Sequence, residues 1–358
     1  MTQTESISLE QDFPCQTESL GDLEQSVQEP LESPAPVAHA AEQKISGFWR
    51  RLAALAIDVL VLAAIGFVVG TIFFNALAQL GSQGFWVGLF IAVIYFSWMN
   101  SSFNNGQTIG KRVMKIRVVD ALGNTISLGR SIKRSALLLV PFMYSSVEQV
   151  SLDLVFKAVA LFVTVAIVYL YIFNNRTRQT VHDLALKTFV VHANYDLALE
   201  EIPVSSRHLL AMTLVGVLIV AFTTFAWPQI ITQYTIPGSS SILEELQKDP
   251  DVYKAAVNHI TSNNSAGHSN EMEIAISVKK LPAPIYMKAK QISELAMQEM
   301  PDVRGVDSLS ITVNYGYNIG IARYQKSLTY TGTPTDWESN TVKIARSAQT
   351  DVSLGIGK

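Results

Sequence analysis

Apolar residues gather in five long runs along the chain, with polar segments between them. The first run, residues 52–74, has Asp58 as its only charge and is long enough to cross a hydrocarbon core of about 30 Å. The third run is the weakest, because it contains Pro141 and Glu148. The pattern predicts an integral membrane α-helical bundle with five spans, at residues 52–74, 85–99, 135–152, 154–173 and 209–231.

Charges in the loops predict the orientation of these spans. Lys and Arg are abundant between the second and third runs and after the fourth, whereas the loops 75–84 and 148–153 contain neither. Loops rich in Lys and Arg stay in the cytoplasm. Two segments on the same side need an even number of crossings between them, so the third run is expected to cross. We therefore expect a multi-pass protein of the plasma or bacterial inner membrane, with a cytoplasmic N-terminus and an extracytoplasmic C-terminal domain.

One cytoplasmic segment has the pattern of a small β-hairpin. Residues 113–119 combine valine and isoleucine with basic residues, residues 121–124 have turn composition, and residues 125–128 are expected to return as a second strand. Residues 188–191 form another short apolar run that is able to pair with them. The sequence therefore predicts a small sheet at the inner face of the membrane.

Residues 232–340 have the pattern of an extracytoplasmic α+β domain. Alternating apolar and polar residues predict strands at 272–278 and 309–315, and apolar residues at helical spacing predict a helix between them. Two further elements are expected: a helix over 242–260, interrupted near Pro250, and a strand within 319–330. Residues 341–358 are assigned to a C-terminal tail, and the membrane domain to residues 44–231.

Composition supports a membrane protein. Only 16% of the residues are charged and 49% are apolar, whereas soluble domains have about a quarter of their residues charged. Residues 1–43 hold nine acidic residues and no Lys or Arg, so they are expected to be a disordered acidic tail. A single cysteine, Cys15, excludes a disulfide framework and a cysteine zinc site.

Asp58 is the most informative single residue, because a carboxylate in the middle of a membrane helix costs about 2.5–3.5 kcal/mol on insertion scales. Arg51 precedes it by seven residues, which places both side chains on one face of a helix. Two interpretations stay open. Asp58 is either a cation or proton site, or a structural carboxylate bonded to a polar group on another helix.

Four segments together resemble the RDD family of membrane proteins: GFWRRLAALAID at 47–58, GQTIGKR at 106–112, IRVVD at 116–120 and RQTVHD at 178–183. The family is named for one Arg and two Asp, which by position match Arg51, Asp58 and Asp183. The resemblance covers about residues 47–192 and implies the membrane architecture. It also suggests transport of an ion or small solute, as proposed for some members.

Four glycines form two small-residue motifs in the first two predicted spans, Gly66 with Gly70 and Gly84 with Gly88. Small residues at this spacing let helix backbones approach closely. They are expected to serve helix packing within the monomer or, alternatively, dimerisation.

The remaining motifs give no catalytic or metal site. GQTIGKR lacks the spacing of a phosphate-binding loop, and His182-Asp183 lacks the further ligands that a metal hydrolase needs. Asp183 is instead expected to pair with Arg112, Arg117 or Arg178. The basic residues between the second and third spans are expected to attract anionic lipid, and nucleic-acid binding is not needed to explain them. No cofactor is predicted.

The leading functional hypothesis is transport of an ion or small solute, with Asp58 as an intramembrane charge site. The alternative is a membrane scaffold or anchor that presents the extracytoplasmic domain to a protein partner. An enzyme ranks third, because the sequence offers no nucleophile with a base, no paired acids and no metal cluster.

Overall fold

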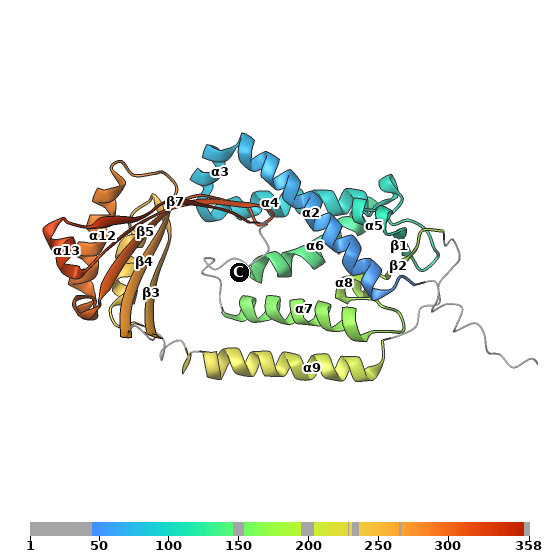
Figure 1. Cartoon of the computed structure of the whole chain (residues 1–358). Coiled ribbons are helices and arrows are strands. Elements are labelled where there is room, and N and C mark those ends of the chain that lie inside the picture. Colours follow the sequence, from blue (N-terminus) through green and yellow to red (C-terminus); the bar gives the residue numbers. More distant parts are fainter. Residues whose placement is uncertain are drawn as a thin grey trace, which may run out of the picture. The chain divides into compact units, whose positions relative to one another are not determined.

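The structure, a computed structural model, describes residues 45–145, 154–194, 204–227, 229–230, 236–264 and 267–353. Over these residues a helical region comes first and a five-stranded sheet with its helices follows (Figure 1). The predicted acidic tail, residues 1–43, lies outside the described residues.

The helical region consists of apolar helices joined by short polar segments. Its longer helices are α2 (Phe48–Ile72), α3 (Phe74–Leu80), α4 (Gly84–Met99), α6 (Leu128–Ser145), α7 (Leu154–Phe173) and α9 (Ser206–Ala221), which continues into the π-helix η3 (Phe222–Ala226). Its short elements are the 3₁₀ turns η1 (Gly81–Gln83) and η2 (Ser102–Asn104) and the helices α5 (Ile109–Val113) and α8 (Val181–Ala185).

Three helical stretches in the described part of the chain are long and apolar enough to cross a membrane: Phe48–Ile72, Phe74–Met99 and Ser206–Ala226. A helix satisfies its own backbone hydrogen bonds, which lipid cannot do. These stretches match the first, second and fifth predicted spans, and the fourth corresponds to a shorter apolar helix, Ala158–Phe173. The structure thus supports a membrane protein, and the number of five crossings stays a prediction.

The third predicted span, residues 135–152, differs from the helix in the structure. α6 begins at Leu128, where the Ser127 side chain accepts a hydrogen bond from the backbone N–H of Arg130 at 3.4 Å. The first turns of α6 are therefore polar, and Pro141 lies inside the helix. Residues 146–153, which complete the predicted span, lie outside the described part.

The predicted β-hairpin is wrong in its second strand. β1 (Ile116–Asp120) pairs antiparallel with β2 (Thr188–His192), with Asp120 opposite Thr188. Residues 125–128 do not form a strand, because the Asp120 side chain accepts the backbone N–H groups of Leu122 and Asn124 at 2.9 Å and turns the chain toward α6. The alternative partner, residues 188–191, is the one found.

The C-terminal region is a sheet of order β3-β4-β5-β6-β7 (Figure 1). β4 and β5 are parallel and are joined through α12, as the predicted strand–helix–strand unit requires, and the other neighbours are antiparallel. Isoleucine, leucine and valine from these strands pack against α11 and α12, with Trp337 fully buried. The elements are α11 (Ser239–Gln247), β3 (Val252–Asn264), β4 (Gly267–Val278), α12 (Ile285–Glu299), η4 (Pro301–Gly305), β5 (Ser308–Asn318), β6 (Arg323–Gly332), α13 (Pro334–Ser339) and β7 (Lys343–Ser353).

Two segments of this region differ from the prediction. The helix expected over 242–260 ends at Gln247, before Pro250, and the chain continues as β3, which pairs along its length with β4. Residues 343–353, assigned to a tail, form β7 on the edge of the sheet beside β6. In both cases the backbone hydrogen bonds of a neighbouring strand outweigh a weak local pattern.

Candidate functional site

One face of α2 carries the buried residues of this helix, spaced mostly three or four positions apart. They are Arg51, Ala54, Asp58, Leu62, Ala63, Gly66 and Gly70. The spacing follows the 3.6-residue helical repeat, so these side chains form a single stripe. Arg51 and Asp58 therefore share a face, as their separation in the sequence indicates.

Asp58 accepts three hydrogen bonds and is 1% exposed. The Tyr95 hydroxyl of α4 donates to its Oδ1 at 2.7 Å, the Thr108 hydroxyl donates to Oδ2 at 2.6 Å, and the backbone N–H of Gly110 in α5 donates to Oδ1 at 2.8 Å. These uncharged donors replace water around the carboxylate and lower the free energy required to bury it. Asp58 thereby fixes α4 and α5 against α2.

Gly110 is required for this arrangement. A Cβ atom at Gly110 would lie 2.0 Å from the backbone oxygen of Ala54, so only glycine lets α5 approach α2 closely enough to reach Asp58. Thr108 also caps α5, because its hydroxyl accepts the backbone N–H of Lys111 at 3.2 Å. The segment 106–112 thus builds the polar surroundings of Asp58.

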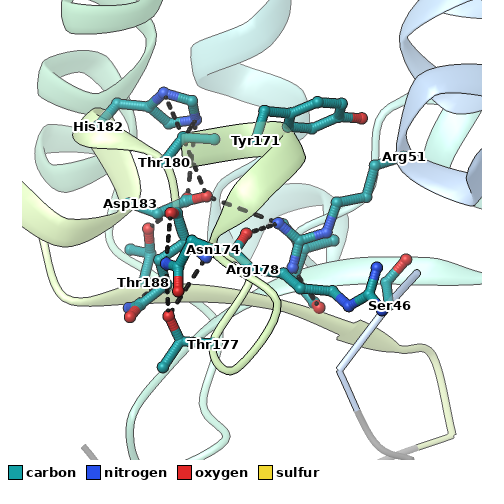
Figure 2. Close-up of polar contacts among 12 residues, drawn as sticks. Ser46, Arg51, Tyr171, Asn174, Thr177, Arg178, Thr180, His182, Asp183 and Thr188 are labelled. Atoms are coloured by element: carbon teal, nitrogen blue, oxygen red, sulfur yellow. Dashed lines mark hydrogen bonds and ion pairs between the residues drawn. The ribbon is translucent and has the colours of Figure 1, made fainter. Parts of the chain in front are cut away.

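Arg51 contacts residues that follow it by more than 120 positions in the sequence (Figure 2). Its guanidinium donates to the backbone oxygen of Arg178 at 2.5 Å and to that of Val190 in β2 at 3.1 Å, and it lies 3.9 Å from the carboxylate of Asp183. Its Nε is buried and has no hydrogen-bond partner among the residues that the structure describes. Arg51 therefore joins the start of α2 to α8 and β2.

Asp183 is the centre of a second buried network. Arg134 of α6 donates to its Oδ1 through Nε at 3.0 Å and Nη2 at 2.7 Å, and the hydroxyls of Thr188 and Thr180 donate at 2.9 Å and 3.3 Å. Arg134 and Arg51 are the arginines within 4.0 Å of the Asp183 carboxylate in the described part of the chain. The prediction named Arg112, Arg117 or Arg178 instead. Arg178 contributes a backbone carbonyl to Arg51 instead of an ion pair.

The pKa values of this network follow from burial and charge. Burial alone raises the pKa of Asp183, but the charge of Arg134, with contributions from His182 and Arg51, brings it well below its ordinary value. Burial lowers the pKa of His182 to about 3 against the opposing charge of Asp183. At neutral pH, Asp183 is therefore ionised and His182 is neutral.

Lys111 is the third cation of the site. Its Nζ donates a hydrogen bond to the side-chain oxygen of Asn100, and no carboxylate of the described residues lies within 4.0 Å of it. Burial, together with the positive charge of Arg134, lowers the pKa of Lys111 to about 7. Lys111 therefore exists in both charge states near neutral pH.

These groups surround one cavity of about 320 Å³. The residues that match the family motif, Arg51, Asp58 and Asp183, all line it, together with Lys111 and Arg134. The apolar part of the lining comes mainly from α2, α6 and α7. Residues far apart in the sequence thus meet at a single cavity, whose volume is near the lower end of that of small-molecule sites.

The sequence pointed to the motif residues but not to their partners. Lys111 and Arg134 contributed only to the charge of a loop, and Tyr95 and Thr108 gave no signal of contact with Asp58. Within the described part of the chain, no group of three or more His, Cys, Asp or Glu is placed to hold a metal ion.

The four glycines of the small-residue motifs face the tip of the β5–β6 hairpin, residues 317–323, rather than another helix. A Cβ at Gly70 would lie 1.8 Å from the Tyr317 hydroxyl, and one at Gly88 would lie 1.6 Å from the backbone oxygen of Ile319. A Cβ at Gly66 would lie 2.8 Å from the Cβ of Ala322, and one at Gly84 would lie 3.1 Å from the backbone oxygen of Asn318.

The β5–β6 tip is apolar and buried at this contact. Ile319 is 0% exposed and packs with Leu62 and Ala92 of the membrane helices. Phe74 of α3 stacks edge-on against Tyr317 and Tyr324, with ring centroids 5.9 Å and 5.5 Å apart. The glycines therefore provide room for a segment of the C-terminal region, which the sequence did not reveal.

Comparisons with known proteins agree with the motif. Neither the curated protein sequences nor the solved structures gave a match. The model of the RDD family matches residues 45–187, a range that contains α2 through α8 and all the charged residues that line the cavity. Residues 45–187 of this membrane protein are therefore an RDD family domain, to which the C-terminal sheet region is an addition.

Proposed function

We propose that the RDD domain binds an ion or small solute in the cavity and moves it across the membrane, with Asp58 as the intramembrane charge site. The observation that carries the proposal is the convergence of Arg51, Asp58 and Asp183 on one cavity. Charged groups within membrane domains are costly, and they generally serve a pathway for ions or solutes. Here the charges come from α2 and α8, which lie more than 100 residues apart in the sequence.

Flux measurement on the purified full-length chain in liposomes tests this proposal. Val168 of α7 lines the cavity and is 44% exposed, whereas Leu161, two helical turns earlier, is 42% exposed and does not line it. Val168→Trp is expected to fill the cavity and abolish most of the flux, and Leu161→Trp is expected to leave the flux unchanged. Equal flux in both variants would contradict a transport path through the cavity.

A membrane scaffold is the second candidate, and the packed β5–β6 tip favours it. A protein that presents its C-terminal region to a partner needs that region to be fixed to the membrane helices, and the tip contacts α2 and α4. A scaffold predicts no flux for any ion or small solute tested with the folded protein. It also predicts that Val168→Trp is without consequence, so the same pair of variants separates the two functions.

The predicted orientation is tested independently of function. A reporter that is active only outside the cytoplasm is expected to work when fused after Tyr234 and to fail when fused after Gly123. The reverse pattern would overturn the five-crossing topology. Inactive reporters at both positions would mean that the run 135–152 does not cross and that the C-terminal region is cytoplasmic.

A further inference from the structure

The cavity is lined by two chemically different sets of side chains. One set consists of the charged groups of α2, α5, α6 and α8, and the other, called here the apolar wall, consists of aliphatic side chains from α2 and α7. Leu55 of α2 and Ile172 of α7 belong to this wall and are 42% and 46% exposed, so the wall continues onto the outer surface of both helices. In a membrane, an exposed apolar surface of this kind is expected to face acyl chains.

The polar residues of the cavity carry an excess of positive charge whenever Lys111 is protonated. Three cations, Arg51, Lys111 and Arg134, line the cavity against two carboxylates, Asp58 and Asp183. His182 adds no charge at neutral pH. A buried cluster with one unbalanced cation is costly unless an anion completes it.

The two carboxylates are already occupied. Asp183 accepts hydrogen bonds from Arg134 and two threonines, and Asp58 accepts its three from uncharged groups. The ammonium group of Lys111 donates its one hydrogen bond within the described part of the chain to the amide oxygen of Asn100. Lys111 is therefore the cation that lacks a carboxylate among the described residues.

Two residues that line the cavity each carry a buried donor that finds no acceptor within the described residues. They are Arg51, through its Nε, and Ser135, through its hydroxyl, and they are 8% and 1% exposed. Buried donors nearly always find an acceptor in native proteins. A phosphate or carboxylate group has oxygens that accept hydrogen bonds from such donors and from the ammonium group of Lys111.

We propose that the cavity binds an amphipathic anion, whose phosphate or carboxylate head group lies at Lys111, Arg51 and Ser135 and whose apolar chain lies along the wall formed by α2 and α7. The ligand enters from the bilayer between these helices. The inference rests on the proposed function only in using the same cavity as the ligand site. It requires binding and does not require transport.

Native mass spectrometry of the full-length chain in neutral detergent measures this binding directly. Dioleoyl phosphatidylglycerol supplies the anionic head and the chain from a membrane lipid, oleate supplies them from a free fatty acid, and dioleoyl phosphatidylcholine is the control without net charge. Inorganic phosphate tests the head group alone. Saturable binding of one phosphatidylglycerol or one oleate, at least about tenfold tighter than phosphatidylcholine and phosphate, is the expected result.

Variants then locate the site. Lys111→Met is expected to weaken binding of the anionic ligand on the order of tenfold, since a hydrogen bond to a charged group is lost. Lys133→Met removes an exposed cation of the same basic segment and is expected to leave binding unchanged. If Lys111→Met does not fold, Val168→Trp with Leu161→Trp as its control provides the same test from the apolar wall.

Three results would overturn the inference: equal affinity for phosphatidylcholine, equal affinity for inorganic phosphate, or undiminished binding in the folded Lys111→Met or Val168→Trp protein. Equal affinity for phosphatidylcholine would show general lipid association. Anion binding without flux would leave this inference standing and remove the transport function. Flux without amphiphile binding would do the opposite.

Discussion

The two halves of the buried face of α2 meet their neighbours in opposite ways. In the N-terminal half, Arg51 and Asp58 reach α4, α5 and β2 through directed hydrogen bonds. In the C-terminal half, Gly66 and Gly70 make contact by having no side chain, and the β5–β6 tip fills the space. One continuous helix face therefore combines polar pairing with close steric fit.

This difference determines what each half tolerates. A hydrogen-bonded charge fails when a partner is removed, because the remaining group stays buried and unsatisfied. A glycine contact fails when atoms are added, because a packed backbone cannot move away without losing its own contacts. Removing atoms therefore tests the N-terminal half, and adding atoms tests the C-terminal half.

Removal of the Asp183 carboxylate is expected to have the largest effect. Asp183→Ala leaves Arg134 and Arg51 buried without their counterion, and the free energy of unfolding should fall by about 3–5 kcal/mol. Denaturant unfolding in detergent measures the change. Glu338→Ala removes a carboxylate paired with Arg304 on the surface of the C-terminal region and should lower stability by less than about 1 kcal/mol. Similar losses in both variants would show that the Asp183 network is no more than a surface ion pair.

A single methyl group tests the steric half. Gly88→Ala places a Cβ against the backbone oxygen of Ile319, so the β5–β6 tip must shift, at a cost of about 1–3 kcal/mol. Hydrogen exchange of residues 317–323 should become faster. Gly129→Ala, where no atom lies within 4 Å of the added Cβ, is the matched control. Unchanged exchange in Gly88→Ala would mean that the tip does not rest on these glycines in solution.

Asp58→Asn separates the structural and the ion-coupling roles of this carboxylate. The amide keeps the size of the side chain but replaces an acceptor by a donor, so one of its three donors loses its partner, and stability should fall by about 1–3 kcal/mol. Melting and flux per folded molecule are measured together. A normal melt with loss of pH-dependent flux would instead assign Asp58 to ion coupling. Asp58→Leu, which removes both the charge and the bonds, completes the series.

The pH dependence of anion binding is the smallest expected effect. Lys111, with its pKa lowered to about 7, is mostly protonated at about pH 6 and mostly neutral at about pH 8. Asp183, whose pKa is held low, keeps its charge over this range. Binding of an anionic amphiphile should therefore weaken several-fold as the pH rises through about 7. In Lys111→Met this dependence should disappear, and its persistence would assign it to another group.

The fold was predictable where a single segment carries a strong repeat. α2, α4 and α9 follow uninterrupted apolar runs, and β4, α12 and β5 follow clear periods of two and 3.6. Prediction failed over residues 248–260 and 343–353, where the local pattern is weak and pairing with β4 and β6 decides the conformation. The returning strand predicted at 125–128 is wrong because Asp120 turns the chain and Ser127 caps α6, which begins at Leu128.

The sequence by itself determined that this chain has apolar helices suited to a membrane, that Arg51 and Asp58 share a helix face, and that a strand–helix–strand unit follows. These features depend on residues that are close together in the sequence, so they are visible as local repeats of apolar and polar positions. Only the tertiary structure decided that Arg134 pairs with Asp183, that Tyr95 and Gly110 bond Asp58, and that the β5–β6 tip fills the glycine face. Such contacts join segments tens to hundreds of residues apart, and their partners are selected by packing and desolvation in three dimensions.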